Sequence, residues 1–349
     1  MHGAFWGHAM PWLDSVEGGA RRSLLRALSA LAAGTVASPW TGWAQVAGYP
    51  QRPIKLIVPN APGSSVDTIG RLLANQLGPL LGQSMVVDNK AGAAGALGIE
   101  SGKNSAPDGY TLIAASSSSI TVAPLLQKAV PYDPLKDFDL VSLVAVLPNV
   151  LVCNTALPVA SVAEFIAYAK AQNSKPGGTL NMASAGLGSV SHLAGVALST
   201  AAGFESLHVP YKGGSQSGAS VVSGETQWTL TPAPNAMALV KGGRLKALGH
   251  SMARGTQPLG NVPSIADTLP SFEFVSWIGL LAPKGLPPTV AEQIRRNLGT
   301  ALQNAGLRES FAVNGAVPVA STGEAFREFL LRDIDQNRKA IRTAGVQAE

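Results

Sequence analysis

The 349-residue chain lacks the sequence features of several function classes. It has one cysteine, Cys153, so no disulfide can form within the chain, and its apolar surroundings predict a buried small hydrophobe rather than a reactive thiol. Charged residues make up 13% of the sequence and aromatic residues 6%. The net charge of +5 is dispersed, and no basic run contains interleaved aromatic residues. Nucleic acid is therefore not expected as a partner.

Common catalytic and metal-binding motifs are also missing. The sequence has no HExxH, no paired CxxC and no carboxylate–histidine cluster at ligand spacing, so neither a metal nor another cofactor is expected. The run 213–218 misses the G-x-S-x-G elbow of serine hydrolases by one position. The interpretation is that the chain is not an enzyme. A hydrolase that pairs Ser64, Ser189 or Ser215 with His192 is kept as an alternative, and it would need an oriented base close to the serine.

The N-terminus has the pattern of an export signal. Arg21-Arg22 precedes a small and apolar stretch, Ala27–Ala37, and a candidate cleavage motif follows at 42–44. This pattern predicts a secretory signal over residues 1–44, by the general or the twin-arginine route, with Met10 as an alternative start. Because no later stretch could cross a membrane, we expect a soluble, exported mature chain.

Short β-branched runs alternate with segments of helical periodicity throughout the mature chain. Strands are expected at 54–58, 85–89, 111–115, 140–147, 150–153, 180–183, 206–209, 226–230, 245–248 and 272–281. This alternation predicts an α/β fold with mainly parallel sheets. A break near residue 155 and a return near 277 predict two α/β domains, one formed by 45–155 with 277–349 and the other by 156–276.

The stretch 59–67 follows the first strand and begins the first helix. Pro62 and Gly63 are suited to a turn, and Ser64 or Ser65 can cap the helix. Free N–H groups and the positive end of the helix dipole make such a turn a place for an anion. Asp67 in the first turn is explained by the dipole alone, although its charge could also counter an anion or bind an amino group. An ordinary capped turn would have the same sequence.

Three later segments offer similar polar groups. Residues 184–192 repeat the pattern of strand end, glycine turn, hydroxyl cap and helix, with His192 in the first helical turn. His192 could orient a ligand or another loop there, although a structural role is the favoured interpretation. Four serines, 116–119, follow the third strand; in isolation they are typical of a solvated loop, with ligand donors as the alternative. The segment Tyr211-Lys212-Gly213 could form a cleft lip or a plain strand-to-helix turn.

Taken together, these segments resemble the Bug-type receptors, the extracytoplasmic solute-binding proteins of tripartite tricarboxylate transporters. The matching motifs, in order, are RPIKLIVP at 52–59, Pro62-Gly63 with Asp67, LGQ at 81–83, APDGYTL at 106–112, PYDP at 131–134, SAGxGS at 184–189 with His192, HVPYKG at 208–213 and LLAP at 280–283. The resemblance covers about residues 49–345, and the combined motifs are specific.

The resemblance implies a type II periplasmic binding protein, with two domains joined by two crossing connections and a ligand in the cleft between them. The implied ligand is a small organic acid or amino acid, the implied partners are membrane transporter subunits, and the receptor is expected to be a periplasmic monomer. The same fold could instead report ligand occupancy to a membrane sensor. The implied ligand-binding residues are Asn60, Ala61, Pro62, Gly63, Ser64, Ser65, Asp67, Ser116, Ser117, Ser184, Ala185, Gly186, Gly188, Ser189, His192, Tyr211, Lys212 and Thr231.

Some positions depart from the family pattern. Asn60 stands where a bulky or aromatic residue is common, Ser64 where a second glycine is common, and Thr226-Gln227 where Val-Asp is common. Thr231 stands near a place that is often acidic or small. The cleft should therefore be richer than usual in hydroxyl and amide groups, and we expect the ligand to present an additional hydrogen-bonding group such as a hydroxyl or an amide.

Overall fold

The computed structural model describes residues 48–346 apart from 129 and 344, so the predicted leader lies outside the described residues. Within the part of the chain that is described, no helix is both long and apolar enough to cross a membrane.

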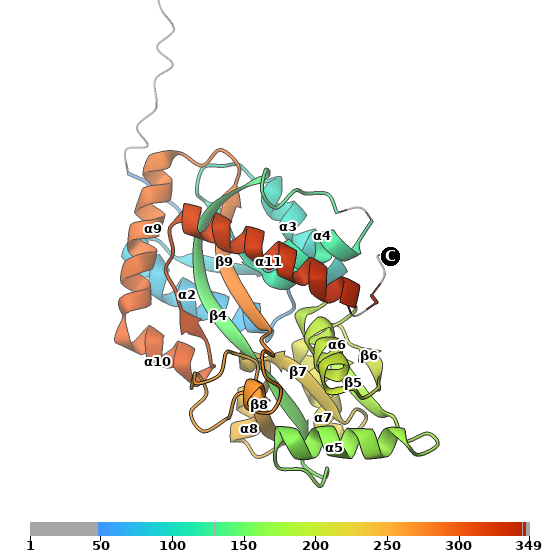
Figure 1. Cartoon of the computed structure of the whole chain (residues 1–349). Helices are drawn as coiled ribbons and strands as arrows, with labels where there is room; N and C mark the ends of the chain where they lie inside the picture. Colours follow the sequence, from blue (N-terminus) through green and yellow to red (C-terminus); the bar gives the residue numbers. More distant parts are fainter. Residues whose placement is uncertain (1–47, 129, 344, 347–349) are drawn as a thin grey trace, which may run out of the picture. The chain divides into compact units, whose positions relative to one another are not determined.

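A ten-stranded sheet organises the chain (Figure 1). Its main path runs β2-β1-β3-β9-β4-β7-β5-β6, and β8 and β10 both pair with β4. The strands are β1 (Ile54–Val58), β2 (Met85–Asn89), β3 (Thr111–Ser116), β4 (Phe138–Asn154), β5 (Leu180–Ser184), β6 (Ser206–Pro210), β7 (Trp228–Pro232), β8 (Leu245–His250), β9 (Val275–Pro283) and β10 (Val317–Pro318).

Helices connect most consecutive strands. The α-helices are α2 (Ser65–Leu81), α3 (Ala96–Lys103), α4 (Ala123–Leu126), α5 (Val162–Asn173), α6 (Val190–Ala202), α7 (Gly214–Ser223), α8 (Ala233–Lys241), α9 (Pro288–Gln303), α10 (Ala305–Val313) and α11 (Gly323–Thr343). Three short turns of other helix types are η1 (Ala93–Gly95), η2 (Ser118–Val122) and η3 (Ile265–Asp267).

The expectation of mainly parallel sheets needs correction, because the sheet is mixed. Parallel pairing holds β2, β1 and β3 together in the first half of the sheet, and β7, β5 and β6 in the second. The centre is antiparallel: β9 pairs with β3 and β4, and β4 also pairs with β7, β8 and β10. None of these antiparallel pairs joins strands that are consecutive in the described chain, so the strand–helix–strand crossover that produces parallel pairing does not link them directly.

The predicted interruption at Pro148-Asn149 does not break the strand, so the expectation of two separate strands was wrong. β4 continues through both residues, pairing with β9 up to Pro148 and with β7 from Asn149 onward. Asn149 also makes hydrogen bonds that are not part of the strand pairing: its backbone N–H donates to Ser251 Oγ, and its side-chain Nδ2 donates to Phe274 O. A proline is tolerated because it stands where the strand changes partners.

Apolar clusters cover both faces of each half. In the first half, one cluster joins the sheet to α2, α9 and α10, and another joins it to α3 and α11. In the second half, α5 and α6 pack on one face and α7 and α8 on the other. Leu126 of α4 and Ile341 of α11 are buried in the α5–α6 cluster, so these two helices contact both halves. The packing leaves strand ends and helix starts from the two halves facing one another.

Candidate functional site

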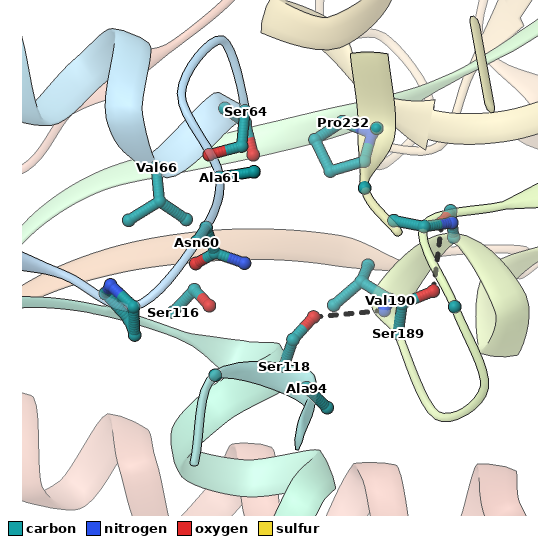
Figure 2. A pocket seen from close by; sticks show the side chains of 18 of the residues that line it. Asn60, Ala61, Ser64, Val66, Ala94, Ser116, Ser118, Ser189, Val190 and Pro232 are labelled. Atoms are coloured by element: carbon teal, nitrogen blue, oxygen red, sulfur yellow. Dashed lines mark hydrogen bonds between the residues drawn. The ribbon is translucent and has the colours of Figure 1, made fainter. Parts of the chain in front are cut away.

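A cavity of about 430 Å³ lies where loops from the two halves of the sheet meet. Figure 2 shows side chains from these loops converging on it. Its walls are residues 59–61, 64–66, 91–95, 116–118, 185–187, 189–191, 211–214 and 276–278, with Leu147, Pro232 and Asn235. Most of these segments follow strands β1, β2, β3, β5, β6 and β7, so the cavity is a meeting place of strand ends and helix starts.

The start of α2 forms one wall. Ser64 is the N-cap, and its Oγ accepts a hydrogen bond from the Asp67 N–H at 3.3 Å. Within the described residues, no hydrogen bond occupies the N–H groups of Ser65 and Val66, both of which line the cavity. These two donors and the positive end of a 17-residue helix favour an anion here.

Asp67 lies behind this wall and does not line the cavity. Its buried carboxylate accepts hydrogen bonds from Gly63 N at 2.9 Å, Asn89 Nδ2 at 2.9 Å and Arg71 Nε at 3.1 Å. Burial by itself would raise the pKa of Asp67, but the hydrogen bonds from Arg71, Gly63 and Asn89 outweigh it and the pKa is lowered. Asp67 is therefore a charged support for the turn.

The start of α6 forms the facing wall. Ser189 is the N-cap and accepts the His192 N–H at 3.3 Å, and Ser191 Oγ accepts the Ala185 N–H at 2.9 Å. Unlike α2, the first N–H of this helix is engaged: Val190 N donates to Ser118 Oγ at 3.1 Å, a bond drawn in Figure 2. The first turn of α6 carries no acidic residue.

Three of the four serines at 116–119 are buried, so the interpretation of this run as a solvated loop was wrong. Ser116, Ser117 and Ser119 are 7%, 1% and 0% exposed, because the chain turns directly into η2 and α4. Ser116, Ser117 and Ser118 line the cavity. Ser117 Oγ is buried without a hydrogen-bond partner in the described structure, which leaves a polar group that a ligand or water can satisfy.

Lys212 is the one charged residue among those that line the cavity. It lies in the segment between β6 and α7, and its backbone N–H donates to Gln216 Oε1 at 3.1 Å. Just beyond, Ser215 Oγ donates to Gly63 O at 2.9 Å and so ties α7 to the α2 turn. The segment therefore brings a cation to the cavity and holds the two halves together beside it.

The floor of the cavity is formed by β9. Trp277 is fully buried, and its Nε1 donates to Asp333 Oδ2 of α11 at 2.8 Å. Burial raises the pKa of Asp333. Phe326 and Phe329 of α11 contact the Trp277 ring edge-on, so this side chain anchors the β9 floor to α11.

The structure brings eleven of the eighteen predicted residues to the cavity and places the rest behind it. Those at the cavity are Asn60, Ala61, Ser64, Ser65, Ser116, Ser117, Ala185, Gly186, Ser189, Tyr211 and Lys212. Those outside the lining are Pro62, Gly63, Asp67, Ser184, Gly188, His192 and Thr231. Several of these support a lining residue: Thr231 Oγ1, for example, accepts a hydrogen bond from Asn235 Nδ2 at 3.2 Å.

The predicted ligand-binding residues did not include the loop 91–95, Asn235 or the β9 residues 276–278, all of which line the cavity. Ser118, which also lines it, was expected only as an alternative donor within the run 116–119. The loop 91–95 had a usable signal, since Gly92 and Gly95 follow a predicted strand just as the glycines of the other two turns do. Gly95 has a φ of 98°, and a Cβ there would lie 2.8 Å from Ser119 Cβ, so glycine is required. The β9 residues carry no local signal, because only sheet pairing brings them to the cavity.

The hydrolase alternative finds no support in this geometry. Ser64 Oγ accepts a backbone N–H, Ser215 Oγ donates to a backbone carbonyl, and His192 Nδ1 accepts the Gly188 N–H at 3.2 Å. In the described residues, the serine–histidine side-chain pair is instead Ser184 Oγ with His208 Nε2, at 2.6 Å, and Ser184 does not line the cavity. No group of three or more His, Cys, Asp or Glu residues suited to a metal occurs in the described part of the chain.

Comparisons with known proteins agree with the interpretation as a binding protein. Residues 69–346 match the model of the tripartite tricarboxylate transporter family receptor. Protein BugT of Bordetella pertussis is 34% identical over 301 residues, which cover 86% of this chain and 91% of BugT.

Solved structures with the same fold include an R. palustris protein with adipate, which has a TM-score of 0.82 and 29% identity and covers 86% of this chain and all of that one. MatC from Rhodopseudomonas palustris, with bound malate, has a TM-score of 0.75 and 27% identity and covers 84% of this chain and all of MatC. The periplasmic binding protein BugD has a TM-score of 0.78 and 27% identity, and the match covers all of BugD and 86% of this chain. These relatives confirm the type II periplasmic binding protein fold and the interpretation as a receptor instead of an enzyme. The chain belongs to the receptor family of tripartite tricarboxylate transporters.

Proposed function

We propose that the protein binds a small carboxylate in the cavity described above and delivers it to a membrane transporter of the tripartite tricarboxylate type. The observation that carries the proposal is the charge of the lining: Lys212 is its one charged residue, and the free N–H groups of α2 add a second attraction for an anion. Adipate and malate, the molecules found with two of the similar structures, are both small dicarboxylates.

Two anchors suit such a ligand. One carboxylate would accept hydrogen bonds from the N–H groups of Ser65 and Val66 at the start of α2. A second polar or anionic end would reach Lys212 on the other half of the sheet. Between them, Leu147, Trp277 and Ile278 offer an apolar floor for a short carbon chain.

Binding would be coupled to closure of two lobes, residues 45–155 with 277–349 and residues 156–276. Two hydrogen bonds that join the halves beside the cavity, Ser118 with Val190 and Ser215 with Gly63, support this proposal. A ligand that contacts both walls binds the closed arrangement better than an open one, and it thereby shifts the population toward closure.

The protein would be located in the periplasm, with residues 1–44 as its export signal. It would act as a monomer. A membrane sensor is a second possible recipient of the closed receptor, because either partner would recognise the same ligand-dependent surface. Deleting the gene of this receptor distinguishes the two: uptake of the ligand is lost if the receptor serves transport and is retained if it serves sensing.

The first experiment is a thermal-shift screen of the chain from residue 45 onward against mono-, di- and tricarboxylates, amino acids and their amides. A ligand of the native state raises the melting temperature by mass action, by an amount that grows with its concentration. We expect a shift with dicarboxylates, no turnover of the compound, and a reduced shift in Lys212→Gln. Equal shifts for the variant and the wild type would remove Lys212 from the site, and turnover would contradict a receptor.

A further inference from the structure

Two histidines that do not line the cavity stack against each other directly behind its α6 wall. His192 lies in the first turn of α6 and His208 on β6, and their ring centroids are 3.9 Å apart with the planes inclined by 15°. His192 is 5% exposed. The binding function proposed above gives this pair no task, although the family resemblance implies His192 as a ligand-binding residue.

Each ring is bonded to the loop 184–189. His192 Nδ1 accepts the Gly188 N–H at 3.2 Å. His208 Nε2 lies 2.6 Å from Ser184 Oγ, and that hydroxyl lies 3.1 Å from both the N and the O of Gly186. Ala185, Gly186, Leu187 and Ser189 of the same loop line the cavity. The pair thus supports the loop from the side opposite to the ligand.

The loop has an unusual backbone that needs such support. Gly186 and Gly188 have φ angles of 122° and 69°, and a Cβ at Gly188 would lie 2.8 Å from Leu126 Cδ1. Glycines of this kind have many alternative conformations. A fixed acceptor for the Gly188 N–H removes most of these alternatives and so sets the positions of Gly186 and Ser189.

The bond at Nδ1 also requires His192 to be neutral. A backbone N–H can donate to Nδ1 only if the ring proton is on Nε2, and a second proton would place two N–H groups against each other. Burial and the neighbouring His208 lower the pKa of His192 to about 4. Within the described residues, His208 is the one titratable neighbour that contributes to this shift. Two stacked imidazoles disfavour protonation of each other, since like charges at such a distance repel.

We propose that His192 is a positioning residue for ligand binding: it holds the loop 184–189 through the Gly188 N–H, and His208 stacked upon it keeps it in the neutral, accepting form. The part of the inference that concerns ligand affinity rests on the proposed binding function. The structural part, an acceptor that orders a glycine loop, is measurable in the free protein.

The test compares two substitutions at the same position, one with a hydrogen-bond acceptor and one without. His192→Asn keeps an acceptor close to the place of Nδ1 and cannot take up a proton, whereas His192→Leu fills the space without an acceptor. In the free protein we expect the Gly188 amide to exchange its hydrogen at least about tenfold faster in His192→Leu than in the wild type, and within about threefold of the wild type in His192→Asn. Nitrogen NMR of the wild-type imidazole should show the proton on Nε2 from pH 5 to pH 8.

The matched control is His250, another buried histidine whose Nδ1 accepts a backbone N–H, that of Met252, at 3.3 Å, but which does not line the cavity. His250→Asn and His250→Leu should leave the Gly188 exchange rate unchanged. With malate and adipate as probes at pH 7.5, His192→Leu should weaken binding about tenfold, and the other three variants less than about threefold.

Several results would overturn the proposal. These are a ring proton on Nδ1 of His192, unchanged Gly188 exchange in His192→Leu, or equal losses in His192→Asn and His192→Leu. If neither probe binds the wild-type protein, the expected ligand class is wrong, while the exchange rates still decide the role of His192.

Discussion

The two walls of the cavity begin in the same way and are supported in opposite ways. In both, a strand ends, a glycine turn follows and a serine caps a helix, Ser64 for α2 and Ser189 for α6. Behind the α2 turn lies a charged network, in which the Asp67 carboxylate is bonded to Arg71, Asn89 and Gly63. Behind the α6 turn lies an uncharged stack of two imidazoles.

The difference shows how a site for an anion can be built without repelling it. A carboxylate near the α2 turn is compatible with an anion because Arg71 compensates its charge and its two oxygen atoms are engaged by the Gly63 N–H and by Asn89 Nδ2. At the α6 turn the neutral Nδ1 of His192 accepts the Gly188 N–H, so this support requires no compensating cation. With the Asp67 network and the histidine stack placed behind the two turns, the groups that face the cavity are backbone donors and hydroxyl groups.

The largest effect is expected from removing the charged support. Asp67→Ala leaves the Gly63 N–H, Asn89 and the Arg71 guanidinium without their shared acceptor, and we expect the free energy of unfolding to fall by about 3 kcal/mol. Urea denaturation measures this loss. Asp67→Asn, which keeps an acceptor without the charge, should lose about half as much. If both variants are as stable as the wild type, the turn is not held by Asp67.

The uncharged support should reveal itself in the pH dependence of stability. The pKa of His192 is lowered to about 4 in the folded state, against 6.5 in the unfolded chain, so the unfolded chain binds more protons between these values. The free energy of unfolding should therefore fall as the pH decreases from 6.5 toward 4, by an amount on the order of 3 kcal/mol from this residue. His192→Asn should reduce that slope and leave the slope below pH 4, where Asp67 contributes, unchanged. An identical pH profile for variant and wild type would contradict the assigned neutral state.

The bonds that join the two walls should have a smaller effect. Ser215→Ala removes the bond to Gly63 O, and because Ser215 does not line the cavity, any loss of affinity reports on closure. A neutral hydrogen bond contributes about 1 kcal/mol, so we expect binding of the dicarboxylate identified in the screen to weaken about fivefold. Isothermal titration calorimetry measures it. Ser223→Ala is the control, since Ser223 bonds only within α7 and its turn. Affinity unchanged in Ser215→Ala would mean that this bond does not favour the closed arrangement.

The smallest expected change concerns selectivity. Asn60 lines the α2 wall, whereas Thr231 acts through Asn235 on the second half. We expect the double variant Asn60→Ala, Thr231→Ala to lose its preference for malate, which carries a hydroxyl group, over succinate, which does not, by about threefold. Competition calorimetry with the two acids gives the ratio. Unchanged selectivity would show that these departures from the family pattern do not recognise an additional group on the ligand.

The sequence by itself determined the local units of the protein. The run 54–58 is short and β-branched, Pro62-Gly63 makes a turn, and Ser64 caps a helix whose apolar residues recur every three or four positions, so this unit could be predicted closely. The same holds for β5, the glycine turn and α6. The family motifs are local strings of this kind, which is why they indicated the fold and the receptor function correctly.

Only the tertiary structure decided which of these units meet and which side chains face the cavity. β4 runs straight through Pro148-Asn149 because distant strands and side chains supply its partners there, and the antiparallel centre of the sheet follows from the same long-range pairing. Ser116, Ser117 and Ser119 are buried because the chain turns directly into η2 and α4 at this point. His192 supports the loop through Gly188, whereas its partner His208 arrives from another strand. Burial, stacking and charge compensation depend on neighbours in space, and the local sequence pattern does not contain them.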